Sequence, residues 1–218
     1  MLLIRIICIL IGYAFGLFQT GFFIGKLHKI DIRDQGSGNS GSTNALRVLG
    51  WQAGLFTFIG DIMKCVLAVL LVHYIYHDQT DVLTLGLYAA LGVTLGHNYP
   101  FYLKFKGGKG IAVMAAIIII TAVFTNMWVF FIPLFVFVSA VYLTRFVSLG
   151  SLQVSMMFFL LMLMYGSLGK FDMPLHSIIE LNVIVFILMV LAWVRHAENI
   201  RRLAKGVENR IDKKNREA

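Results

Sequence analysis

The segment GSGNSGSTNALRVLG, residues 36–50, is rich in glycine and polar side chains within a chain that is 59% hydrophobic. Successive glycine and serine residues allow backbone N–H groups to converge on an anion, and serine hydroxyls add further donors. Arg47 can complete such a nest by a bidentate contact to a phosphate or carboxylate group. We predict that this Gly/Ser segment binds an anion, with a flexible linker as the alternative. Its candidate ligands are Ser37, Asn39, Asn44 and Arg47.

A second segment, GHNYPFYLKFKGGKGIA, covers residues 96–112 and contains the turn GGKG at residues 107–110. This Gly/Lys turn places bare backbone amides next to an ammonium group, immediately before an apolar run. Its spacing is not that of a Walker A loop, which requires G-x-x-x-x-G-K-[ST]. We expect Lys109 to be a ligand, and Lys104 and Lys106 to contact lipid phosphates.

Two hydroxyl groups stand three residues apart in the third segment, RFVSLGS, residues 145–151. Residues at this spacing share one face of a helix, so Ser148 and Ser151 can act on the same ligand if the segment is helical. Helix capping is the alternative for such a pair.

The fourth segment, RHAENIRRLAKGVE, covers residues 195–208 and contains His196 and Asn199 at the same spacing of three. These two side chains can point at one ligand. The alternative is a basic helix that binds anionic lipid, and this alternative is sufficient for Arg201, Arg202 and Lys205.

Other candidate groups are less convincing. Asp61 and Lys64 lie within an apolar run, where charges usually pair with each other or face a cavity, so we expect a structural pair. His73 and Asp78 match the H-x-x-x-x-D acyltransferase signature but lie apart from the four segments. His73 and His77 have helical metal-ligand spacing but lack a third ligand, and we expect no metal site.

The elements that position these segments are long apolar runs. With only 14% charged residues, the composition predicts an all-α integral membrane protein. Cys8 and Cys65 both fall in apolar runs and predict no disulfide. We expect one seven-span catalytic domain, residues 1–200, followed by a basic cytoplasmic tail, residues 201–218. The expected spans are residues 2–25, 52–76, 82–99, 110–127, 128–144, 151–167 and 177–195.

Most of the 19 lysine and arginine residues fall in the loops that also hold the four polar segments. The positive-inside rule places this side in the cytoplasm, so the N-terminus is expected outside and the C-terminus inside, with Arg5 as a mild objection. The net charge of +8 thus reflects topology, and we expect no nucleic-acid partner.

The four segments, in this order, resemble the bacterial acyl-phosphate:glycerol-3-phosphate acyltransferases of the PlsY type. DIMK at residues 61–64 and the seven-span layout match as well, so the resemblance covers almost the whole chain. It implies a multi-pass enzyme of the bacterial cytoplasmic membrane that needs no cofactor. The implied reaction moves a fatty acyl group from acyl phosphate to the 1-hydroxyl of glycerol 3-phosphate and gives lysophosphatidic acid, the first step of phospholipid synthesis.

The resemblance also implies the substrate site. It carries over Ser37, Arg47, Lys109, Ser151, His196 and Asn199, to which the segments themselves add Asn39, Asn44 and Ser148. Among these, His196, Asn199 and Ser37 are expected to be catalytic. The expected partners are the two substrates, membrane lipid and an upstream enzyme that forms acyl phosphate.

The sequence departs from the family pattern at a few positions. Leu17 and Gln19 stand where the family commonly has serine and proline, Cys65 replaces a frequent glycine, and Val113 replaces a frequent threonine. These departures concern local helix packing and leave the four segments intact.

Two alternatives remain open. The proton of the attacking hydroxyl can go to His196 or to a substrate phosphate oxygen, and the resemblance favours the phosphate. A transporter of a phosphorylated metabolite is the alternative from another class, in which Asp61 and Lys64 would gate a path. Alcohol phosphatidyl transfer requires a D-x-x-D-G segment, which this sequence lacks.

Overall fold

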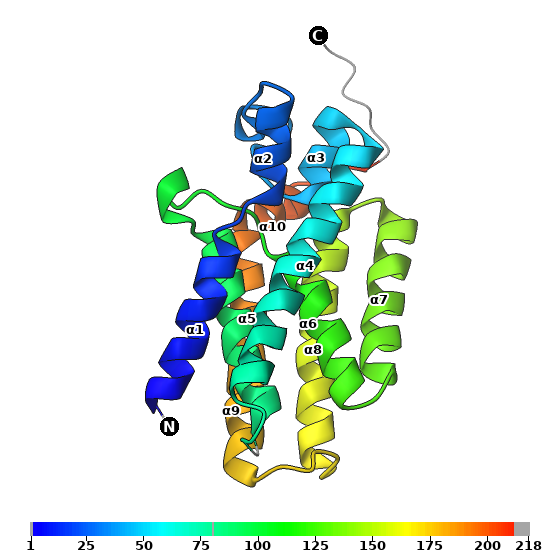
Figure 1. Cartoon of the computed structure of the whole chain (residues 1–218). Helices are drawn as coiled ribbons and strands as arrows, with labels where there is room; N and C mark the ends of the chain where they lie inside the picture. Colours follow the sequence, from blue (N-terminus) through cyan, green and yellow to red (C-terminus); the bar gives the residue numbers. More distant parts are fainter. Residues whose placement is uncertain (1, 80, 212–218) are drawn as a thin grey trace.

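The computed structural model describes residues 2–79 and 81–211, and all regular structure in these ranges is helical. Long helices stand side by side, and short helices gather at one end, near α2, α3 and α10 (Figure 1). The elements are α1 (Leu2–Gly16), α2 (Thr20–Leu27), η1 (Ile32–Asp34), α3 (Ser42–Leu49), α4 (Trp51–Ile75), α5 (Val82–Asn98), η2 (Phe101–Leu103), α6 (Ile111–Phe124), α7 (Trp128–Thr144), α8 (Val147–Ser167), α9 (Leu175–Arg195) and α10 (Ala197–Ala204).

Each of the seven expected spans coincides with a helix or a pair of helices. The first is divided, because α1 ends at Gly16 and α2 begins at Thr20. The Gly/Ser segment contains α3, a helix that the sequence analysis did not predict. The helix α10 runs across residue 200, the predicted start of the tail, and residues 212–218 of that tail lie outside the described residues.

Within the described residues, four helical stretches are long and apolar enough to cross a membrane, and α6 and α7 are shorter apolar helices. The 25 residues of α4 extend roughly 37 Å, more than the ~30 Å of a hydrocarbon core. Large apolar side chains point outward, among them Phe135 and Leu143, as expected for a surface in contact with lipid. The four long stretches are Leu2–Leu27, α4, α8 and α9.

The helix α5 lies at the centre of the bundle, packed against α1, α4, α6 and α9. Its contact with α1 is close enough that glycine is required on both helices. A Cβ atom at Gly92 would lie 2.1 Å from the backbone oxygen of Ile9, and one at Gly12 would lie 1.9 Å from that of Ala89. Small residues at such crossings let backbones approach, which is how helices associate where lipid removes the hydrophobic driving force.

A partly buried ionic cluster joins the helices at the end of the bundle opposite α10. Arg5 of α1 donates to both carboxylate oxygens of Glu180 on α9, at 2.8 and 2.9 Å, and lies 3.4 Å from Asp81 before α5. Arg5 therefore has a structural partner, which explains a cation at the predicted outer end of the first span. Cys8 and Cys65 are buried free thiols, as expected.

The α1–α5 crossing predicts an asymmetric response to added methyl groups on one helix. Gly92→Ala drives its Cβ into rigid backbone and should destabilise the protein by about 1–3 kcal/mol. Gly86→Ala is the matched control, because its Cβ would meet only the Val69 side chain, at 3.0 Å. Thermal denaturation of the two variants in detergent measures the difference. An equal or larger loss of stability for Gly86→Ala would contradict this packing.

Candidate functional site

A cavity of about 300 Å³ is lined by residues of α3 and α10, and these two short helices lie at the same end of the bundle (Figure 1). It brings together segments that are more than 100 residues apart in sequence. All nine of the predicted site residues line it: Ser37, Asn39, Asn44, Arg47, Lys109, Ser148, Ser151, His196 and Asn199.

The start of the Gly/Ser segment is folded around the buried side chain of Asn44. Its Oδ1 accepts hydrogen bonds from the backbone N–H of Ser37, at 2.8 Å, and from the Ser37 hydroxyl, at 3.1 Å. Its Nδ2 donates to the carbonyls of Ile32 and Gln35, both at 3.0 Å. Both the oxygen and the nitrogen of the Asn44 amide thus form hydrogen bonds with the surrounding loop. A direct contact between Asn44 and substrate stays a prediction.

The rest of the Gly/Ser segment supplies a cation and a link to the second motif. Arg47, on α3, lines the cavity, and no carboxylate of the described residues forms an ion pair with it. Asn39 accepts a hydrogen bond from the backbone N–H of Gly41 at 2.9 Å and donates to the carbonyl of Gly107 at 3.4 Å. The Gly/Ser segment and the Gly/Lys turn therefore form adjoining walls of the cavity.

Hydrogen bonds from Arg195 to backbone carbonyls hold the Gly/Lys turn in place. Arg195 donates to the carbonyl of Gly107 at 2.9 Å and to that of Gly108 at 3.1 Å. Gly110 then adopts a φ of +79°, a conformation that favours glycine, and α6 begins. The first N–H groups of α6 have no partner within the helix and carry its positive dipole end, so this terminus suits an anion. Gly110 and Ile111 line the cavity.

Lys109 adds an ammonium group to the same wall. Its Nζ donates a hydrogen bond to Oδ1 of Asn199 on α10. Burial, reinforced by the positive charge of Arg202, lowers the pKa of Lys109 to about 8, although Glu208 acts in the opposite direction. The amine is therefore a cation at neutral pH that titrates within an accessible range.

Glu208 lines the cavity and was missed by the sequence analysis. Its carboxylate is buried and accepts hydrogen bonds from the hydroxyl of Ser148 at 3.1 Å and from Nδ2 of Asn199 at 2.7 Å. Arg202 donates a hydrogen bond to the Glu208 carboxylate at 2.9 Å and also lines the cavity. In the sequence analysis, contact with anionic lipid was a sufficient explanation for Arg202. Glu208 ends the quoted fourth segment, but no spacing distinguished it from a surface acid.

His196 lies at the junction of α9 and α10, with 3% of its surface exposed. Its Nδ1 lies 2.7 Å from the carbonyl oxygen of Ala192, which can only accept, so Nδ1 carries the proton and Nε2 is an acceptor. Burial lowers the pKa of His196 to about 4, the nearby Lys109 charge acts in the same direction, and the bond to Ala192 opposes it. The imidazole is therefore neutral at pH 7.

The two serines of the third segment lie on α8, and both line the cavity, as their spacing predicts. The hydroxyl of Ser151 donates to the carbonyl of Val147 at 2.8 Å, within its own helix. Apolar residues line the cavity as well: Phe58 of α4, Ala112 of α6, Phe137 and Val141 of α7, and Val147 of α8. The cavity thus combines cationic and apolar side chains.

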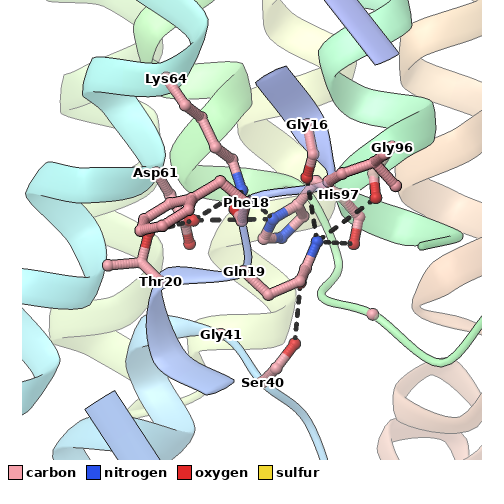
Figure 2. Close-up of polar contacts among 12 residues, drawn as sticks. Gly16, Phe18, Gln19, Thr20, Ser40, Gly41, Asp61, Lys64, Gly96 and His97 are labelled. Atoms are coloured by element: carbon pink, nitrogen blue, oxygen red, sulfur yellow. Dashed lines mark hydrogen bonds and ion pairs between the residues drawn. The ribbon is translucent and has the colours of Figure 1, made fainter. Parts of the chain in front are cut away.

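The predicted pair of Asp61 and Lys64 is confirmed, with 2.8 Å between Nζ and Oδ1 (Figure 2). Both are buried on α4, and Asp61 lines the cavity together with His97, neither of which was predicted as a site residue. His77 and Asp78 form an exposed pair beyond α4, at the other end of the bundle. No group of three potential metal ligands occurs among the described residues.

These features define a class, that of helical membrane proteins with a cation-lined cavity at one end of the bundle. Residues 6–206 match the family model described as glycerol-3-phosphate acyltransferase, and the chain belongs to this family. It is 38% identical to the glycerol-3-phosphate acyltransferase of Macrococcus caseolyticus, with 93% of this chain and 95% of the relative covered. It is 36% identical to that of Clostridioides difficile, with 96% of both chains covered.

Solved structures agree with this assignment. The chain superposes with a TM-score of 0.77, 27% identity and 94% coverage of both chains on the glycerol 3-phosphate form of PlsY, an integral membrane glycerol 3-phosphate acyltransferase. The lysophosphatidic acid form of PlsY gives a TM-score of 0.74 with 26% identity, again over 94% of both chains.

The lowered pKa of Lys109 predicts how substrate binding depends on pH. A phosphate is attracted by the ammonium form, which is present below about pH 8 and lost above it, so the KM of a phosphorylated substrate should rise as the pH increases from 8 to 9.5. The second ionisation of a phosphate monoester, with a pKa near ~6, is already complete in this range. Lys109→Arg retains its charge there and should remove the rise. An equally steep rise of KM in Lys109→Arg would contradict the assignment of this pH dependence to Lys109.

Proposed function

We infer that this protein is a membrane glycerol-3-phosphate acyltransferase that uses acyl phosphate as donor and releases lysophosphatidic acid. The single observation that carries this conclusion is the composition of the cavity wall. Arg47, Lys109 and the N-terminus of α6 can bind phosphate, and Phe58 and Phe137 of the same cavity can contact an acyl chain. A site of this kind allows a water-soluble phosphorylated alcohol to meet an apolar activated donor.

Acyl phosphate is a mixed anhydride, so the reaction requires no covalent intermediate on the protein. The oxygen of the 1-hydroxyl of glycerol 3-phosphate attacks the carbonyl carbon, and the bond from that carbon to the phosphate oxygen breaks. An ester forms, inorganic phosphate leaves, and the hydroxyl proton is transferred to a base. Because both substrates carry phosphate, charge neutralisation and positioning are the main requirements, worth up to roughly 7–11 kcal/mol when the reacting atoms are well aligned.

The proposed roles follow from the chemistry of each side chain. Arg47 and Lys109 hold phosphate groups, and Ser37 and Ser151 add hydroxyl donors when a substrate oxygen replaces their bonds to Asn44 and Val147. Asn39, Asn44 and Ser148 complete the lining of the cavity. Asn44 does so by holding the surrounding loop through its hydrogen bonds to Ser37, Ile32 and Gln35. His196 and Asn199 orient the substrate near the reacting carbonyl, and we propose His196, Asn199 and Ser37 as the catalytic residues.

A substrate phosphate oxygen is our proposed proton acceptor. A group with a pKa of about 4, as in His196, is a weak base at neutral pH, whereas the phosphate of glycerol 3-phosphate has a second pKa near ~6. The unprotonated Nε2 of His196 can instead accept a hydrogen bond from a substrate hydroxyl and orient it.

This proposal predicts a modest effect of His196→Gln. Glutamine retains a hydrogen-bond acceptor but cannot act as a base, so we expect kcat to fall by less than about tenfold and the acid limb of the pH profile to stay in place. His196→Leu removes the acceptor and should be more severe. A loss of roughly 10²–10⁴-fold in His196→Gln, the range for removal of a general base, would contradict the proposal.

The arrangement in the membrane is also proposed. Seven spans, with the N-terminus outside and the C-terminus in the cytoplasm, are consistent with the positive-inside rule and place the cavity at the inner leaflet of the bacterial cytoplasmic membrane. Residues 1–200 form the catalytic domain and residues 201–218 a basic tail, with α10 belonging to both. We also propose an upstream enzyme that forms acyl phosphate as a partner, because the donor has to be supplied. The transporter alternative is not favoured, because Asp61 and Lys64 pair with each other.

The activity is tested with purified protein, synthetic palmitoyl phosphate and glycerol 3-phosphate. We expect lysophosphatidic acid and inorganic phosphate to appear in equal amounts, and palmitoyl-CoA not to replace palmitoyl phosphate efficiently. Arg47→Gln, which removes a cation from the cavity wall, should reduce the rate at least about tenfold. Uptake of glycerol 3-phosphate into proteoliposomes without any acyl product would overturn the proposed function.

A further inference from the structure

The side chain of Gln19 occupies the break between α1 and α2, with 1% of the residue exposed. Its Nε2 donates to the carbonyls of Gly16 at 3.1 Å, Gly96 at 3.3 Å and His97 at 3.1 Å (Figure 2). Its Oε1 accepts a hydrogen bond from the hydroxyl of Ser40 at 3.2 Å. One buried amide therefore connects the C-terminal end of α5 with the Gly/Ser segment.

His97, at the C-terminal end of α5, links Gln19 to the Gly/Lys turn. The carbonyl of His97 that accepts from Gln19 also accepts from the backbone N–H of Gly108, at 3.0 Å. The imidazole lies directly beneath the turn, since a Cβ at Gly108 would lie 1.9 Å from Nε2 of His97. The turn that carries Lys109 thus rests on both the backbone and the ring of His97.

The ring of His97 is held from its other side by Lys64. Nζ of Lys64 lies 2.8 Å from each of three acceptors: Nδ1 of His97, Oδ1 of Asp61 and the carbonyl oxygen of Phe18. An ammonium group has three donors and no acceptor, so all its protons are used and Nδ1 must accept. Displacement of the ring would leave a buried charge partly unpaired, which fixes its position.

Ser40, which donates to Oε1 of Gln19, links this residue to the cavity. Ser40 is buried, and its neighbours Asn39 and Gly41 both line the cavity. The position of Ser40 therefore sets the position of the Gly/Ser segment relative to α5.

We propose that Gln19 is a positioning residue for acyl transfer, which keeps the Gly/Ser segment and the Gly/Lys turn at a fixed separation through Ser40 and His97. The inference rests on the proposed function, in which groups from both segments bind phosphate. A phosphate that contacts Arg47 on one side and Lys109 on the other binds well only if that separation is maintained, and small misplacements have large effects on rate.

The test compares Gln19→Leu, Ser40→Ala and the double variant with the wild type. Leucine is close to glutamine in size but makes no hydrogen bond. We expect Gln19→Leu to raise the KM of at least one phosphorylated substrate by roughly threefold to tenfold, the effect of one or two lost hydrogen bonds. Ser40→Ala should raise the same KM, and the double variant should match Gln19→Leu, because the two residues act through one shared contact.

Ser155→Ala is the matched control. Ser155 is also fully buried, its hydroxyl donates to the carbonyl of Leu152 at 2.9 Å within α8, and it does not line the cavity. This variant should leave each KM within about twofold of the wild type. A smaller fraction of folded enzyme lowers the maximal rate but leaves KM unchanged, so the KM separates positioning from general loss of stability.

Unchanged KM values in Gln19→Leu and Ser40→Ala, or strictly additive effects in the double variant, would overturn the inference. If Gln19→Leu does not fold, Ser40→Ala carries the test alone, and an unchanged KM in that variant overturns it. Failure of the proposed function has a different signature, because the wild-type protein would then form no lysophosphatidic acid.

Discussion

Polar groups next to lipid have to be given partners by the protein itself, and this constraint determines how the cavity is built. The loops that form its walls are not stabilised by regular secondary structure, so single side chains satisfy their buried polar atoms. Asn44 binds the start of the Gly/Ser segment, Arg195 binds the carbonyls of the Gly/Lys turn, and Gln19 connects the two. Once these bonds are made, the cation of Arg47 and the N-terminus of α6 are left for a ligand.

The same constraint applies to the cations of the cavity, which share its lining with apolar side chains. Burial lowers the pKa of Lys109 to about 8 because less water stabilises the ammonium group, and an anion next to that group would stabilise it in place of water. A phosphate group that enters the cavity therefore replaces water with fixed donors. An acyl chain attached to that phosphate can at the same time lie along Phe58 and Phe137. Donor, acceptor and leaving group can thus be held within one cavity.

Much of this organisation could be predicted from the sequence. Apolar runs near the length of a bilayer gave the helices, and glycine, serine and cations at short spacing gave the four segments that the structure brings together. The spacing of three predicted that Ser148 and Ser151 share a helix face, and both lie on α8 and line the cavity. These successes share a cause, since helix periodicity and turn chemistry are local properties of the chain.

The remaining features depend on contacts between distant segments. Nothing in the sequence near Gln19 indicates that it meets Ser40 and His97, because the three residues lie on different elements. Glu208 has the appearance of a surface acid until α10 brings it to Ser148, sixty positions away. The α3 helix was missed because glycine, serine and asparagine disfavour helix interiors, although they suit the loop that precedes α3.

The central claim is that both phosphate-binding loops face the same side of the membrane. It is tested most directly by labelling single cysteines with a membrane-impermeant thiol reagent, in a background where Cys8 and Cys65 are replaced by alanine. Ser37→Cys and Lys106→Cys should both react in inside-out vesicles and not in intact spheroplasts, whereas Asp78→Cys, at the other end of the bundle, should show the reverse. Reaction of the Ser37 and Lys106 positions from opposite sides would contradict the shared cavity and the acyl transfer proposed for it.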